Sequence, residues 1–170
     1  MRLFVVSDTH CDFAILHKCM ARHQADVTYW YHLGDSEVPP EFIQQDFVGV
    51  RGNCDHYEGL PYTRDIVFPF GTIHLEHGHM ISGNIQAYIK ATGCRIFLSG
   101  HTHVKLAKLY EDGIWQFNPG SLVRPRDGMY GSYLLIDVDR TTGKVYHYEF
   151  HLVDTLMGTE VEGGKAYTAS

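Results

Sequence analysis

The sequence contains a series of short apolar runs, and each of them ends within a few residues of an Asp, Asn or His. The first run, Leu3–Val6, is rich in β-branched and aromatic residues and does not alternate with polar ones, which is typical of a strand buried on both faces. Because ligand sites in open α/β sheets form at the carboxyl ends of the strands, we expect the polar residues after these runs to meet at one edge of a sheet. They are Asp8, His10, Asp35, Asn53, His77, His101 and His103.

Helix and strand signals alternate through the first hundred residues. Asp12 can cap a helix in which Phe13 and Leu16 lie at helical spacing, and this helix would be the first crossover of a βαβ unit. Further strands are expected at 27–31, 47–50, 66–68, 72–75 and 95–98, and further helices at 39–45 and 82–92. This order indicates an α/β fold.

The second half of the chain has antiparallel signals. Asp112-Gly113 is a strong two-residue hairpin turn, and residues 133–139 are expected to pair with 145–150. We therefore predict a second sheet. Residues 154–170 are rich in Gly, Thr and charge without periodicity, so we interpret them as a tail that is loose or docked on a partner. No linker divides residues 1–153, which we expect to form one domain.

Composition excludes several classes of protein. The chain has 170 residues and 14 Lys and Arg against 20 Asp and Glu, without a basic cluster, so binding to nucleic acid is not expected. The apolar start of the chain is interrupted by Ser7 and Asp8 before it could serve as a signal peptide, and no run is long enough to span a membrane. Four cysteines without CxxC spacing fit reduced thiols. We expect a cytoplasmic protein.

Each residue of the strand-end set has an ordinary explanation when it is taken alone. An Asp after a strand is most often a turn or cap residue, Gly52-Asn53 is a common turn dipeptide, and the paired histidines could lie on the surface. Taken together, carboxylate oxygen, amide oxygen and imidazole nitrogen suit divalent Mn, Fe, Ni or Zn, and the absence of clustered thiolates argues against a structural zinc knot. Seven ligands are enough for two ions.

The ordered motifs resemble those of the calcineurin-like metallophosphoesterases. The resemblance is carried by Asp8-Thr9-His10, Gly34-Asp35, Gly52-Asn53-Cys54-Asp55, His77-Gly78-His79 and Gly100-His101-Thr102-His103, and it runs to about residue 150. Chain length, the Gly-Asn-Cys-Asp variant and Asn118-Pro119-Gly120-Ser121 are similar to the small YfcE-type phosphodiesterases. The ordered set is specific, although any one motif alone is weak.

This resemblance implies a four-layer α/β/β/α sandwich of two mixed sheets and a phosphodiesterase with two divalent transition-metal ions. Mn²⁺ is the expected ion, with Fe, Ni or Zn as alternatives. The resemblance also implies that a hydroxide between the metals attacks phosphorus in line, with Asn53 and His77 taking part in catalysis. One metal would be held by Asp8, His10 and His103 and the other by Asn53, His77 and His101, with Asp35 bridging both.

One position departs from the family pattern. Larger members carry a histidine where this chain has Cys54, and that histidine is thought to assist the leaving group. A neutral thiol is a poor substitute, so Asp55 is a further catalytic candidate, although a capping role is the simpler explanation for it. Arg124 and Arg126 are candidate phosphate contacts, with a solvated loop as the alternative. His79 is expected either to contact the substrate or to support its own loop.

Three functions remain open at this level. The first is a phosphodiesterase that acts on a small or extended phosphodiester. The second is a non-catalytic scaffold, because the retromer subunit of this fold binds proteins and lacks a complete ligand set, whereas all seven ligands are present here. The third is a nuclease, for which this short and acidic chain has no DNA-capping segments. The sequence does not decide the substrate, the native metal or whether the chain forms a homo-oligomer.

Overall fold

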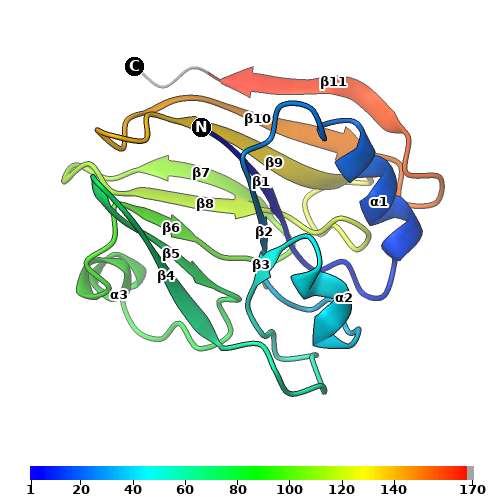
Figure 1. The fold of residues 1–170 in the computed structure, drawn as a ribbon, viewed down its shortest axis with the longest axis horizontal. Coiled ribbons are helices and arrows are strands. Elements are labelled where there is room, and N and C mark those ends of the chain that lie inside the picture. The colour runs from blue at the N-terminus through cyan, green and yellow to red at the C-terminus, as the bar shows by residue number, and fades with distance from the viewer. Residues whose placement is uncertain (168–170) are drawn as a thin grey trace.

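The computed structural model describes residues 1–167, which form two β-sheets packed face to face (Figure 1). Within these residues, sheet A has the strand order β11-β10-β9-β1-β2-β3, formed by β1 (Arg2–Val6), β2 (Tyr29–His32), β3 (Val48–Gly49), β9 (Gly131–Val138), β10 (Val145–Val153) and β11 (Glu160–Tyr167). Sheet B has the order β4-β5-β6-β8-β7, formed by β4 (Thr63–Phe68), β5 (Gly71–Glu76), β6 (Ile96–Leu98), β7 (Lys105–Leu109) and β8 (Trp115–Pro119). The helices of this part of the chain are α1 (Phe13–Ala21), α2 (Pro40–Gln44) and α3 (Ile85–Ala91).

The strands alternate between two apolar layers. In β1, Leu3 and Val5 face the core between the sheets, while Phe4 and Val6 belong to a second cluster under α1 and α2. A third, smaller cluster lies between sheet B and α3 and includes Phe97. Figure 1 shows α1 and α2 outside sheet A and α3 outside sheet B. The four-layer α/β/β/α sandwich of two mixed sheets is therefore confirmed, as is the prediction that the first strand is buried on both faces.

The helix ends follow their capping residues. Asp12 caps α1 as expected, since its side chain accepts a hydrogen bond from the Ile15 N–H at 3.1 Å. The third helix begins at residue 85, whereas the sequence suggested residue 82. Gly83 has a φ of +72°, which is incompatible with a helix, and Asn84 then caps α3 by accepting from the Ala87 N–H.

The antiparallel half of the chain is divided between the two sheets. The Asp112-Gly113 turn joins β7 to β8 in sheet B, but the expected hairpin of residues 133–139 and 145–150 joins sheet A. There β9 pairs with β1, with Leu3 opposite Ile136. All eight residues of β9 are buried, because Leu134 and Ile136 pack in the core between the sheets and Leu135 packs in the cluster under α1 and α2.

The last described segment belongs to the tail that the sequence analysis expects to be loose or docked on a partner. Residues 160–167 form the edge strand β11, which pairs antiparallel with β10. Its first residue is fixed by side chains from other strands, because Glu160 Oε1 accepts hydrogen bonds from Tyr133 Oη at 2.7 Å and from His151 Nδ1 at 2.5 Å. Such long-range partners leave no local periodicity to detect. Residues 168–170 of the expected tail lie outside the described residues.

In the described part of the chain, no helix is both long enough and apolar enough to cross a membrane. The parallel pairs β1–β2 and β5–β6 send their carboxyl ends into loops that carry the candidate ligands.

Removing a side chain from the core between the sheets should lower the free energy of unfolding. Leu98 is fully buried in this core, so we expect Leu98→Ala to lower the free energy of unfolding by about 2–5 kcal/mol. Urea denaturation followed by circular dichroism measures the change. The matched control is Val67→Ala on β4, where the side chain is 79% exposed and the expected change is within about 0.5 kcal/mol. Equal effects of the two substitutions would contradict this description of the core.

Candidate metal centre

The loops after the strands have an unusual backbone. Five of the seven candidate ligands have a positive φ, namely Asp8, His10, Asp35, His101 and His103. Residues other than glycine rarely adopt a positive φ. Each such residue costs about 1–3 kcal/mol and persists only where the surrounding structure enforces the conformation. Main-chain hydrogen bonds enforce it here, because the Asp8 N–H donates to Gly34 O and the His10 N–H to Asp35 O, each at 3.0 Å. The ends of β1 and β2 are thus tied together.

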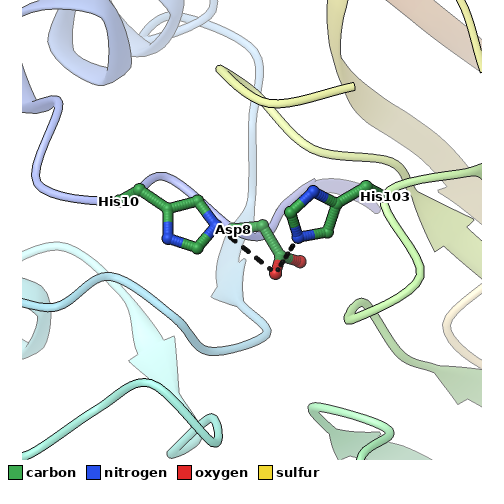
Figure 2. Close-up of side chains that lie close together, drawn as sticks. All are labelled: Asp8, His10 and His103. Carbon is green, nitrogen blue, oxygen red and sulfur yellow. Dashed lines mark ion pairs between the residues drawn. The ribbon is translucent and has the colours of Figure 1, made fainter. Parts of the chain in front are cut away.

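The first group of ligand atoms surrounds one oxygen of Asp8. Its Oδ1 lies 3.0 Å from His103 Nε2 and 3.8 Å from His10 Nε2, and Figure 2 shows both imidazoles turned toward this carboxylate. Asp8 comes from the end of β1 and His103 from the loop between β6 and β7, so the group joins the two sheets. Two imidazoles and one carboxylate are a common ligand set for a divalent transition metal.

The second group lies next to the first. His77 Nε2 is 3.1 Å from Asp35 Oδ2 and 3.8 Å from Asp8 Oδ1. Asp8, Asp35 and His77 therefore form a second set that could hold a metal, and Asp8 belongs to both sets. The bridging role that the resemblance implies for Asp35 stays a prediction. In the described residues the carboxylate common to the two groups is Asp8.

Hydrogen bonds at the far side of each imidazole fix its orientation. His77 Nδ1 lies 2.8 Å from Leu33 O, His103 Nδ1 lies 2.6 Å from Arg124 O, and His10 Nδ1 lies 3.0 Å from a carboxylate oxygen of Glu37. Each acceptor holds the proton on Nδ1 and leaves Nε2 free to bind a metal.

The free atoms are the ones that a metal would need. In the described part of the chain, the buried side-chain polar atoms without a hydrogen-bond partner are Asp8 Oδ1, His10 Nε2, Tyr31 Oη, His77 Nε2 and His79 Nδ1. Three of these belong to the two ligand groups, and buried polar atoms are rarely left without a partner. The donor set and its free atoms therefore fit divalent metal ions.

The charges within the cluster support each other. Burial alone would raise the pKa of Asp8, but the adjacent imidazoles of His103 and His77 hold it below its usual value. Burial would likewise raise the pKa of Asp35, and the adjacent imidazole of His77 more than offsets it. Burial lowers the pKa of His77, whereas the adjacent carboxylates of Asp35 and Asp8 raise it overall. Both carboxylates are thus held in the charged form that binds cations.

The remaining candidates surround an open cleft of about 400 Å³ above the two groups. Asn53 is exposed and His101 is half-buried, and both line this cleft. Arg124 and Arg126 are exposed and line the same cleft. His79 packs beside the ligands, with its ring centroid 5.6 Å from that of His77 and 6.2 Å from that of His101. The catalytic and substrate-contact roles of these residues stay predictions.

Asp55 is engaged with main-chain groups. Its carboxylate accepts hydrogen bonds from the N–H groups of Asp35 at 2.9 Å, Glu37 at 2.8 Å and Gly52 at 2.7 Å. These contacts hold the loop after β2 against the loop after β3. The geometry favours the capping alternative for Asp55 over a direct role in catalysis.

Sequence reasoning missed several residues that support the site. Glu37, two positions after Asp35, contacts His10, and its acidic character beside the ligand motif was the available signal. Ser121 Oγ donates to the main-chain oxygen of Asp8 at 2.8 Å, which gives the Asn-Pro-Gly-Ser motif a role in support. A Cβ at Gly52 would collide with Asp35 Oδ1, so this position requires glycine.

Similarity to known proteins agrees with the geometry of the site. The model of the calcineurin-like phosphoesterase superfamily domain matches residues 1–141. The chain is similar to the probable metallophosphoesterase YsnB of Bacillus subtilis, with 27% identity over 157 residues that cover 88% of this chain and 91% of YsnB. It is also similar to the phosphodiesterase YfcE of Escherichia coli K12, with 28% identity over 105 residues that cover 57% of this chain and 55% of YfcE.

A solved structure of Vps29, a protein that is not named as a phosphoesterase, has a similar fold. Wild-type Vps29 of Entamoeba histolytica, complexed with Zn²⁺, superposes with a TM-score of 0.75 at 21% identity and covers 99% of this chain and 98% of its own. At that identity the likeness shows the fold alone. Side chains must decide the function.

The position of Asp55 gives a test of its role. We expect Asp55→Ala to lower the free energy of unfolding of the metal-free protein by at least about 2 kcal/mol, because each buried N–H that loses its acceptor costs about 1–3 kcal/mol. Urea denaturation measures the change, with Asp46→Ala, at an exposed residue after α2, as the control. An unchanged unfolding free energy combined with lost hydrolysis would instead support the direct catalytic role.

Proposed function

The chain belongs to the calcineurin-like phosphoesterase superfamily, and we propose on that premise that it is a phosphodiesterase with two divalent transition-metal ions. The observation that carries the proposal is the pair of adjacent ligand groups sharing Asp8, with free Nε2 and Oδ1 atoms turned toward one another. Mn²⁺ is the ion we propose, with Fe, Ni or Zn as alternatives.

The residues that would hold the ions lie in the two groups and on the adjoining cleft wall. The first ion would be held by Asp8, His10 and His103, the second by Asn53, His77 and His101, and Asp35 would lie between them. Such ions lower the pKa of bound water and neutralise negative charge on a phosphoryl group. This is the chemistry that hydrolysis of a phosphate ester requires, and no nucleophilic side chain is needed for it.

The residues around the cleft would position the substrate. Arg124 and Arg126 can each give two hydrogen bonds to phosphate oxygens, and their exposure leaves them free to do so. Between them, Pro125 also lines the cleft. We propose that these arginines orient the ester so that its leaving group faces Cys54 and Asn53, on the opposite loop.

A non-catalytic scaffold is the alternative function. The likeness to Vps29 supports it at the level of the fold. The complete ligand set and the unpartnered atoms of Asp8, His10 and His77 support the enzyme, because a protein-binding surface has no need for them. The acidic chain, with a formal charge of -6, does not favour a nuclease. The four cysteines are free, which fits a cytoplasmic enzyme.

Hydrolysis of bis(4-nitrophenyl) phosphate by the full chain with Mn²⁺ tests the proposal. We expect His77→Ala and Asn53→Ala each to lower kcat/KM by at least about 100-fold, because each removes a ligand proposed for the same ion. The control is His17→Ala, at an exposed position of α1, and it should leave hydrolysis unchanged.

Elemental analysis of the same samples gives a second measure. We expect two ions per wild-type chain after reconstitution and fewer in His77→Ala. Wild-type protein that binds two ions and hydrolyses no ester would favour the scaffold. Normal activity in His77→Ala with an intact circular dichroism spectrum would show that the ligand assignment is wrong.

Cys54 leads to a prediction about the leaving group. The thiol lines the cleft, and burial together with the charge of Asp35 raises its pKa to about 11. A neutral thiol is a weak proton donor, so we expect the leaving oxygen to depart largely unprotonated. Since general acid catalysis is typically worth about 10²–10⁴-fold, we expect the rate to fall steeply as the leaving group becomes more basic.

A series of aryl and alkyl methyl phosphodiesters, assayed at metal saturation, measures that slope. Cys54→His should flatten it if the imidazole reaches the leaving oxygen, and Cys54→Ser is the control of similar size. A shallow slope in the wild type, unchanged by the histidine, would show that the proton comes from another residue.

A further inference from the structure

The three oriented histidines of the metal centre are not held in the same way. His77 and His103 donate from Nδ1 to main-chain oxygens, those of Leu33 and Arg124. His10 alone among them donates to a side-chain carboxylate, that of Glu37, at 3.0 Å. A carboxylate carries a full negative charge where a carbonyl carries only a dipole. The two ligand groups therefore differ electrostatically, although each contains imidazole and carboxylate.

The chain fixes Glu37 for this contact. Its main chain has a φ of +59°, and its N–H donates to Asp55 at 2.8 Å, so the loop after β2 is held in one conformation. The His10 side chain is 3% exposed and that of Glu37 27% exposed, so water competes weakly for the hydrogen bond. The other ring nitrogen of His10, Nε2, is buried without a partner and faces Asp8.

The opposite side of the centre is built more loosely. Asn53, proposed for the second ion, is exposed, and His101 is half-buried. The structure gives the Asn53 side chain one weak contact, from its amide nitrogen to the sulfur of Cys54 at 3.7 Å. In the described part of the chain, no hydrogen bond or ion pair joins a charged side chain to the side chain of Asn53 or His101.

We propose that Glu37 is a positioning residue that makes the site of Asp8, His10 and His103 the tighter of two unequal metal sites. It holds the proton of His10 on Nδ1, which leaves Nε2 as the ligand atom, and its negative charge makes the imidazole a stronger donor to a cation. Loss of such a partner typically weakens metal affinity about 10–100-fold. The inference rests on the proposed function for the identity of the ligands, but it concerns binding and not hydrolysis.

Titration of the metal-free full chain with Mn²⁺, with free ion followed by electron paramagnetic resonance, tests the proposal without a substrate. We expect a tight and a weak binding phase in the wild type. Glu37→Ala should weaken the tight phase about 10–100-fold and leave the weak phase within about twofold. Glu37→Gln keeps a hydrogen-bond acceptor and loses the charge. The Mn²⁺ affinity of its tight phase should therefore lie between those of the wild type and Glu37→Ala. The matched control is Glu41→Ala, at an exposed residue of α2, which should match the wild type.

A spectroscopic measurement separates positioning from simple structural support. In metal-free protein labelled with ¹⁵N-histidine, we expect His10 to carry its proton on Nδ1 in the wild type and in Glu37→Gln, and to populate both tautomers in Glu37→Ala. The main-chain bond from Glu37 to Asp55 survives both substitutions, so the melting temperatures should stay close.

Three results would overturn the proposal. The first is a single binding phase, or none, in the wild type. The second is an unchanged tight phase in Glu37→Ala, and the third is equal weakening of both phases in Glu37→Ala together with a lower melting temperature. The proposed phosphodiesterase function fails separately. A wild type that shows Glu37-dependent binding but hydrolyses no diester would support the role of Glu37 and reject the enzyme, whereas an active wild type with an unchanged Glu37→Ala tight phase would do the reverse.

Discussion

The buried carboxylate of Asp8 is the interaction on which the centre depends. Its side chain is fully buried, and a charge in that position is costly unless every lone pair has a partner. One oxygen, Oδ2, accepts from Ser7 Oγ at 2.6 Å and from the His101 N–H at 3.0 Å, so the loop after β1 of sheet A is bound directly to the loop after β6 of sheet B. The other oxygen faces the imidazoles. Asp8 is thus both a link between the sheets and a ligand, and a substitution there would disturb both roles.

The same loops combine strain with support. The positive φ values at the ligands are strained backbone conformations. Hydrogen bonds from residues outside the ligand set hold the loops in these conformations. Asp55 holds the loops after β2 and β3, and Ser121 holds the main chain of Asp8. Buried His32 adds a further link, because it contacts Thr9 Oγ1 at 2.9 Å and accepts from the Gly34 N–H. Burial lowers the pKa of His32 to about 4, so this link is neutral and adds no charge beside the metal ligands.

The sequence predicted the features that depend on neighbours in the chain. The strand around Leu3–Val6, the Asp12 cap and the convergence of strand ends were all available from periodicity and residue type. Features that depend on distant residues were not. The place of β9 beside β1 rests on pairing between residues far apart in the chain, such as Leu3 and Ile136, and the start of β11 is held by the bonds of Glu160 to Tyr133 and His151. Glu37 was overlooked because its partner His10 is 27 positions away. The grouping of Asp8, Asp35 and His77 follows from side-chain directions, which no spacing rule provides.

The fold by itself does not separate a hydrolase from a scaffold, because one fold can carry unrelated functions. The separation must come from atoms that one function needs and the other does not. A surface that only binds another protein gains nothing from burying Asp8 Oδ1, His10 Nε2 and His77 Nε2 without partners, since each unpaired polar atom costs about 1–3 kcal/mol. A cation placed among them would satisfy all three at once, and it would also offset the charges of Asp8 and Asp35. The cost of leaving these atoms unpaired is therefore an argument that this chain binds a metal ion.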